Sequence, residues 1–337
     1  MSDSPTAFGR RPYAASLAAG LISSLLYTSI FLSFAFLIPV QLVYGRNGRK
    51  PGLAAAGIAC LGIFSAQGGK LIASAIGNAG AASLSAMEIV ATFLPSLVLL
   101  GALAFMNAPL GRPWKPVYKA FAVSAFCALA ALPILIVLEG DASITAYLEQ
   151  RIASLLSPLK SAADEGYDAS ALMAALDPKE LVSTSITTLH SIYAALVFLL
   201  IGGSWRLGNR LSGIESRGWE ETVAIDELRM PYALIWAFLA SWAFVLATLA
   251  LNAPAAPSAI AWNCALTLSL AYAAQGLGII VHLFKSWNMP KSMRVLIAVV
   301  AAMSLVTPLG LGLAASLPLF GVTEIWIPYR KPKGVGA

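Results

Sequence analysis

The sequence predicts an all-α fold, a polytopic transmembrane helix bundle with about eight to ten crossings. Of its 337 residues, 58% are hydrophobic and 11% are charged, whereas a soluble domain carries roughly 25% charged residues. The apolar residues form blocks of about 20 or more, the length that a helix needs to cross the hydrocarbon core. These blocks lack the strict alternation of membrane β-strands, so helices are favoured over a barrel.

The apolar blocks set the expected helices. They cover residues 14–44, 53–77, 84–107, 118–138, 183–205, 231–251, 257–284 and 294–327. The first and last blocks are long for one crossing and short for two, so each is either one long helix or two short ones. Pro308 and the glycines after it favour a break in the last block. We favour two short helices in both blocks, which places both chain termini on one side of the membrane.

The charged loops set the orientation. Most lysines and arginines fall in loops between the blocks, at 45–50, 111–119, 206–230, 285–294 and 330–333. Basic loops mark the cytoplasmic side of a bacterial inner-membrane protein. Between residues 139 and 180 the balance reverses, with eight acids and three bases, so this segment is expected to be extracytoplasmic. The chain then divides into an N-terminal transmembrane half (1–138), the acidic segment (139–182), a C-terminal transmembrane half (183–327) and a cytoplasmic basic tail (328–337).

The acidic segment carries two helix patterns. Its stretch SITAYLEQRIASLLSPLK spaces apolar residues as an amphipathic helix does, and these residues are Ile144, Leu148, Ile152, Leu155 and Leu159. Further on, DPKE (177–180) is typical of a helix start, with Asp177 as N-cap, Pro178 in the first turn and Glu180 at the third position. We expect the helix that contains the fifth apolar block to begin there.

Several function classes are excluded by what the sequence lacks. It contains no P-loop, zinc-protease helix motif or nucleophile elbow, so we expect no enzyme activity, no cofactor and no metal. The net charge of +6 belongs to the membrane loops and does not indicate nucleic acid as a partner. Cys60, Cys127 and Cys264 stand singly in apolar blocks, so we expect small buried apolar residues and neither a disulfide framework nor a metal site.

Two charged residues within apolar blocks form one candidate site. If a turn near 77–82 joins two antiparallel helices, Lys70 and Glu88 both lie roughly 8–15 Å below it. Charges at membrane depth are costly and usually face protein or a water-filled cavity. The pair is therefore a candidate substrate-binding site. A structural salt bridge is the alternative, and so is a loop near the surface, because the flanking glycines can break the helices.

A second polar stripe lies in the stretch YAAQGLGIIVHLFK. Gln275 and His282 are seven residues apart and share a helix face, with Asn263 roughly 120° around the same helix. Gly276 and Gly278 allow another helix to approach closely. Asn263 and Gln275 either line a substrate cavity or make interhelical hydrogen bonds, each worth about 0.6–2 kcal/mol.

Two further features indicate partner docking. Ala14 and Ala18 give the first span a small-residue spacing that permits close helix packing. In the tail, Glu324 and Arg330 are expected to pair with each other or with a partner, beside Trp326 at the membrane edge. The alternative for this tail is an ordinary interfacial anchor.

The same stretches carry a family resemblance. YAAQGLGIIVHLFK, followed by a basic linker and FGVTEIWIPYRK, resembles the YybS-like family of bacterial membrane proteins. The stretches ELRMPYALIWAF and LIPVQLVYGRNGRKPGL also fit it, and Glu324 stands where that family usually has Asp. The family is similar in layout to the substrate-binding S components of energy-coupling factor (ECF) vitamin transporters and to the rod-shape protein MreD. In S components, small residues of the first span dock on a coupling subunit.

The resemblance and the absence of a Walker motif together imply two functions. The first is a small-molecule transporter, or its substrate-binding membrane component, that works in the lipid bilayer with ATPase and coupling subunits as partners. The expected number of crossings exceeds the six of usual S components. The second is a non-transporting scaffold whose partners are cell-envelope proteins.

Overall fold

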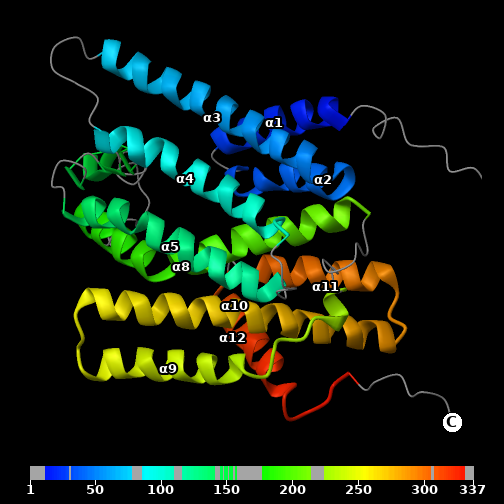
Figure 1. The fold of residues 1–337 in the computed structure, drawn as a ribbon. Helices are drawn as coiled ribbons and strands as arrows, with labels where there is room; N and C mark the ends of the chain where they lie inside the picture. Colours follow the sequence, from blue (N-terminus) through cyan, green and yellow to red (C-terminus); the bar gives the residue numbers. More distant parts are fainter. Residues whose placement is uncertain are drawn as a thin grey trace, which may run out of the picture.

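The regular elements of the protein are helices throughout the part of the chain that the structure describes. In this computed structural model, the described residues are 12–29, 32–77, 86–109, 116–140, 145–146, 148–150, 152–154, 156–157, 177–213, 224–304 and 307–330. Most of the long helices lie side by side and run across the view in Figure 1, in alternating directions. The predicted all-α fold is therefore confirmed.

The helices follow the apolar blocks closely. They are α1 (Pro12–Thr28), η2 (Ser33–Ala35), α2 (Leu37–Asn47), α3 (Arg49–Gly77), α4 (Ala86–Met106), α5 (Pro116–Gly140), α8 (Pro178–Leu211), η4 (Ile225–Glu227), α9 (Leu234–Ala250), α10 (Ala255–Ser286), α11 (Lys291–Ser304) and α12 (Pro308–Thr323). Helices α8 and α10, and residues Arg49–Ala73 of α3, are long and apolar enough to cross a membrane. The number of crossings stays a prediction.

The first apolar block folds as two short helices. Ser16 of α1 donates a hydrogen bond of 2.8 Å to the carbonyl of Pro51 at the start of α3. Ser24, two turns further along α1, lies against Gly62 of α3, so α1 and α3 run in the same direction and α2 returns between them. With 11 residues, α2 is about 16 Å long and cannot cross the hydrocarbon core. Both ends of the α1–α2 pair therefore lie at one end of the bundle.

The last apolar block is broken as well. Helix α11 ends at Ser304, and α12 begins at Pro308 after the extended residue Thr307. Proline fits the first helical position because its missing N–H would have no partner there. At 14 and 16 residues, these two helices are also about 21–24 Å long, too short to cross the core upright.

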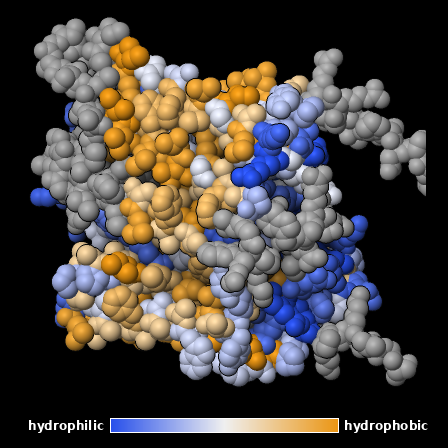
Figure 2. Space-filling model, viewed as in Figure 1, coloured by the Kyte–Doolittle hydropathy of each residue, from blue (hydrophilic) through white to orange (hydrophobic). Residues whose placement is uncertain are grey.

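Positive charge gathers at one end of the bundle, which we call the basic end. Helices α2, α4, α8 and α10 finish there, and α3, α5 and α9 start there (Figure 1). Arg46 after α2 donates a 3.1 Å hydrogen bond to the carbonyl of Leu211 at the end of α8. Lys119 of α5 likewise donates to the carbonyl of Ala108 after α4, at 3.2 Å. Figure 2 shows hydrophilic residues concentrated at this end, beside a broad apolar surface.

The predicted start of α8 is confirmed. Asp177 is the N-cap, and its carboxylate accepts a 3.1 Å hydrogen bond from the backbone of Lys179. Most of the acidic segment lies outside the described residues, and the stretch predicted as an amphipathic helix is described only in part. The described residues within that stretch (145–146, 148–150, 152–154 and 156–157) are helical.

The described buried apolar residues form three clusters, and α8 contributes to the first. Its residues Ile201 and Trp205 belong to the core built by α1 to α5, while α9, α10 and α12 form separate cores around Tyr272 and Val245. Among the cysteines, Cys127 is buried and Cys60 is half-buried. The expectation of burial was wrong for Cys264, which is exposed on an apolar helix whose outer face suits lipid.

Candidate functional site

The C-terminal half contains a buried ion pair between Glu324 and Arg330. After α12 the chain turns and returns, so that Arg330 lies against Glu324. Arg330 Nε donates to Glu324 Oε1 at 2.6 Å, and Arg330 Nη2 bonds the second carboxylate oxygen. The two side chains are 4% and 7% exposed. Such two-point pairing is the strongest geometry that guanidinium and carboxylate groups adopt, and the predicted pairing within the tail is confirmed.

The same guanidinium holds a backbone segment. Arg330 Nη1 donates to the carbonyl of Asp226 at 2.8 Å, and Arg330 Nη2 donates to the carbonyl of Leu228 at 3.0 Å. Residues 228–231 have no regular helix of their own, so their polar groups need partners of this kind. Just before this segment, η4 packs on Gly278, where a Cβ would collide with the carbonyl of Ile225.

Gln275 completes this arrangement. Its amide nitrogen donates to Glu324 Oε2 and to the carbonyl of Gly321, both at 2.9 Å. Its amide oxygen accepts a 2.6 Å hydrogen bond from the backbone of Met230. We call Gln275, Glu324 and Arg330 the C-terminal clasp, because together they fasten α10, α12 and the segment 224–231. Gln275 lies 11 residues before the end of α10, or about 16 Å along its axis.

Two glycines make the clasp possible. Helices α10 and α12 cross where Gly276 faces Gly321. A Cβ on Gly276 would collide with the carbonyl of Leu317, and one on Gly321 with the carbonyl of Tyr272. The expectation that Gly276 and Gly278 admit close neighbours is therefore confirmed, and the neighbour of Gly278 is the single-turn 3-10 helix η4.

Asn263 serves a different contact. Its side chain donates to the carbonyl of His190 at 2.5 Å and accepts from the backbone N–H of Ala194 at 2.8 Å. These two groups would bond each other in a regular helix, so Asn263 inserts into the backbone ladder of α8. It lies 12 residues, about 18 Å, from Gln275 along α10. Asn263 and Gln275 thus bond different neighbouring helices, as the interhelical alternative of the sequence analysis expects, and their role in lining a cavity stays a prediction.

The ion pair beside the clasp is more accessible. Lys285 Nζ lies 2.6 Å from Asp226 Oδ2, and the lysine side chain is 51% exposed. The hydrogen bond from Lys285 holds the pKa of Asp226 below its ordinary value, and the charges of Lys285 and His282 act in the same direction. His282 is half-buried near this pair, at the basic end of α10.

The other predicted site residues lie apart from the clasp. Lys70 is exposed on α3, and the side chain of Glu88 lies outside those that the structure describes. Ala14 and Ala18 are exposed on the outer face of α1, while Ala15 and Ala19 pack inward. The roles proposed for Lys70, Glu88, Ala14 and Ala18 stay predictions.

The sequence analysis missed a second polar cluster. Gln41 of α2 is fully buried and exchanges two hydrogen bonds with Asn107 after α4, at 2.7 and 3.1 Å. Its amide nitrogen also donates to Asn209 of α8 at 2.7 Å. We call these residues the amide cluster. Its signal was a single glutamine in the apolar stretch LIPVQLVYG, the same signal that drew attention to Gln275.

Trp326 lies at the surface beside the clasp. Trp326 is 66% exposed, and neighbouring Ile327 is 51% exposed. Both residues are held in the turn between Glu324 and Arg330.

In the described part of the chain, no group of three or more His, Cys, Asp or Glu residues is placed to hold a metal ion.

These features define the class: an α-helical membrane protein with buried polar clusters near one end of its bundle. Residues 14–315 match the model of a family described as predicted membrane protein (DUF2232). The protein belongs to this family, which establishes contact with a lipid bilayer. No curated protein and no solved structure matches the chain.

Proposed function

We propose that this protein is a small-molecule transporter, or the substrate-binding membrane component of one, that does not carry its own ATPase. The proposal places it in the bacterial inner membrane with the basic end in the cytoplasm. The positive-inside rule supports that orientation. The resemblance to YybS-like proteins, and through them to ECF S components, supports the same function.

One observation carries this proposal: each half of the chain contains a pair of consecutive helices of which at least one is too short to cross the membrane upright. The N-terminal half opens with α1 and α2, of which α2 has only 11 residues, and the C-terminal half closes with α11 and α12, of 14 and 16 residues. Interrupted helices in both halves surround the substrate site in secondary transporters, and we extend this feature to a transport component that works with a separate ATPase. Irregular backbone is tolerated at membrane depth only where protein or a water-filled cavity covers it.

Each short pair also meets a buried glutamine. Gln41 is part of α2 and binds α4 and α8 through the amide cluster. Gln275 binds the end of α12 through the clasp. In a transporter, such contacts fix the short helices in one conformation and release them when the protein opens. Asn263 and Gln275 would then act by holding helices, and Lys70 and Glu88 remain the proposed substrate-binding pair.

A direct test is to identify a small molecule that travels with the protein. The full chain is purified in mild detergent, denatured, and the released compounds are identified by mass spectrometry. We expect one compound to be enriched over an unrelated membrane protein purified in the same way, and to be reduced in a Lys70→Leu, Glu88→Leu variant. Enrichment of no compound would count against a substrate-binding component, and equal enrichment in the variant would reject the Lys70–Glu88 site.

A second function, a scaffold for cell-envelope assembly, is favoured by the exposed Trp326. The turn that carries it is fixed by the buried Glu324–Arg330 pair, so the indole is presented in a defined place, as a docking residue must be. Under this function a Trp326→Ala variant would fold normally and lose its partner protein. Under the transport function the same variant would keep its activity.

A further inference from the structure

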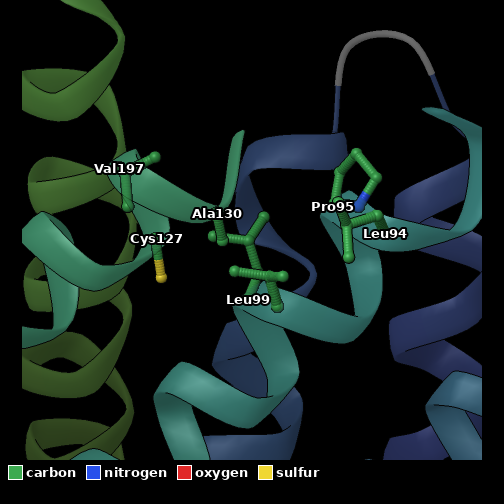
Figure 3. A pocket seen from close by; sticks show the side chains of 7 residues that line it. Leu94, Pro95, Leu99, Cys127, Ala130 and Val197 are labelled. Carbon is green, nitrogen blue, oxygen red and sulfur yellow. The ribbon is translucent and has the colours of Figure 1, made fainter. Parts of the chain in front are cut away.

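We infer that a cavity between α4, α5 and α8 binds a hydrocarbon chain. It has a volume of about 100 Å³ and is lined by Leu94, Pro95, Val98, Leu99, Cys127, Ala130 and Val197 (Figure 3). This inference is independent of the proposed transport function, because it rests on the lining and position of the cavity alone.

The cavity follows from a proline in α4. Pro95 lies inside the helix, where it cannot donate to the carbonyl four residues earlier and its ring pushes that turn away. Pro95, Val98 and Leu99 line the cavity from the same helix. Small residues on the neighbouring helices, such as Ala130 of α5, do not fill that space (Figure 3).

The lining excludes water. All seven side chains that line the cavity are apolar or, in Cys127, weakly polar, and a buried water needs two to four polar partners. An apolar cavity of about 150 Å³ in another protein stays dry and binds benzene. A space of about 100 Å³ therefore suits a few carbons of a chain and not a polar substrate.

The position of the cavity identifies the chain as the inner part of an acyl group. Pro95 lies 9 residues from the start and 11 residues from the end of α4, or about 14–17 Å from each. That depth is the middle of a hydrocarbon core about 30 Å thick. Pro95 is exposed, and Phe126 and Leu129 beside Ala130 are 68% and 65% exposed, so the mouth opens on a face that lipid covers.

The occupant therefore has the chemistry of an unbranched hydrocarbon chain at mid-membrane depth. Such a chain comes from a bilayer phospholipid or from a free single-chain amphiphile. Cys127 offers a way to detect it, because this residue is only 3% exposed. A chain at the protein surface passes Phe126 and Leu129, and only a chain within the cavity reaches Cys127.

The test uses the full chain in lipid nanodiscs with two photoreactive probes. One is a phosphatidylcholine with a diazirine near the methyl end of one acyl chain, and the other is a free fatty acid with the same labelled chain. After illumination and digestion, mass spectrometry locates the adducts. We expect adducts on Cys127 from at least one probe, and the more effective probe identifies the source. Adducts on Phe126 and Leu129 alone, with neither probe reaching Cys127, would overturn the inference.

Matched variants separate occupancy from general labelling. Ala130→Phe fills the cavity, and Ala125→Phe places the same ring on an exposed position of the same helix. We expect the Cys127 adduct to be lost in the first variant and kept in the second. Should Ala130→Phe fail to fold, Leu99→Ala enlarges the cavity and is expected to raise labelling of Cys127 relative to Phe126. Labelling of Cys127 that changes in neither Ala130→Phe nor Leu99→Ala would also refute the inference.

Discussion

Removing one charge of the buried ion pair is the sharpest perturbation of the fold. Glu324→Gln keeps the size of the side chain but leaves Arg330, which is 4% exposed, without a counter-charge. The cost of breaking a buried ion pair by removing one partner is about 3–5 kcal/mol. For a chain of 337 residues that each contribute about 2.1 cal/mol/K to the entropy of unfolding, each kcal/mol lowers Tm by about 1.4 °C. We therefore expect Glu324→Gln to lower Tm by about 4–7 °C.

The assay is thermal unfolding of the purified full chain in detergent, followed by the loss of the monodisperse peak in size-exclusion chromatography. Arg229→Ala is the control, because this arginine is 61% exposed and its Nε lies 3.9 Å from the same carboxylate. An exposed pair contributes about 0–1 kcal/mol, so the control should shift Tm by only about 1 °C.

A double variant completes the reasoning. In Glu324→Met, Arg330→Met both charges are absent, so no buried charge is left unpaired, and replacing a buried pair by apolar side chains is often neutral. We expect this variant to be clearly more stable than Glu324→Gln, despite the two carbonyls that lose Arg330 as a donor. A Glu324→Gln variant that unfolds within about 2 °C of the native chain would refute the account of a buried, stabilising clasp.

Three further predictions test other contacts. Gly321→Ala should destabilise the protein by about 1–3 kcal/mol, because α10 and α12 must separate to admit the new methyl group. Gly202→Ala is its control: a Cβ at Gly202 meets nothing within 4 Å, so this variant should leave Tm unchanged in the same assay. Asn263→Leu should cost only about 1 kcal/mol, because the freed groups of α8 can bond each other, and a loss of hydrogen-exchange protection in α8 would contradict this. Asp226→Asn should cost less than about 1 kcal/mol near neutral pH. Because the pKa of Asp226 is lowered in the folded state, that cost should decline as the pH falls below about 4, and a pH-independent difference would exclude the Lys285 ion pair as its source.

The fold was predictable because a bilayer leaves few alternatives. Backbone polar groups in hydrocarbon must bond within their own segment, so apolar blocks of sufficient length had to be helices. The breaks at 29–37 and 304–308 were detectable from block length and from Pro308. The start of α8 at Pro178 was also readable, because capping depends on local residues alone.

The site was only partly predictable, because pairing between distant segments is set by packing. The sequence pointed to Gln275 and to the Glu324–Arg330 pair. It did not predict the hydrogen bond between Gln275 and Glu324, because that contact depends on Gly276 and Gly321 bringing the backbones of α10 and α12 together. It grouped Asn263 with Gln275 from helix geometry, although the neighbours of these residues lie on α8 and α12 respectively. The amide cluster joins Gln41 to Asn209 across 168 positions, a distance that no local pattern encodes.

The most direct test of the proposed transport function is to identify the proteins that accompany this one. The tagged full chain is purified from its native membrane in mild detergent, and co-purifying proteins are identified by mass spectrometry. The transport proposal predicts an ATPase pair with a membrane coupling subunit, recovered from the native chain and reduced when Ala14 and Ala18 on the exposed face of α1 are replaced by Leu. Recovery of cell-wall or division proteins, lost in Trp326→Ala and unchanged in the α1 variant, would contradict it and establish the scaffold function.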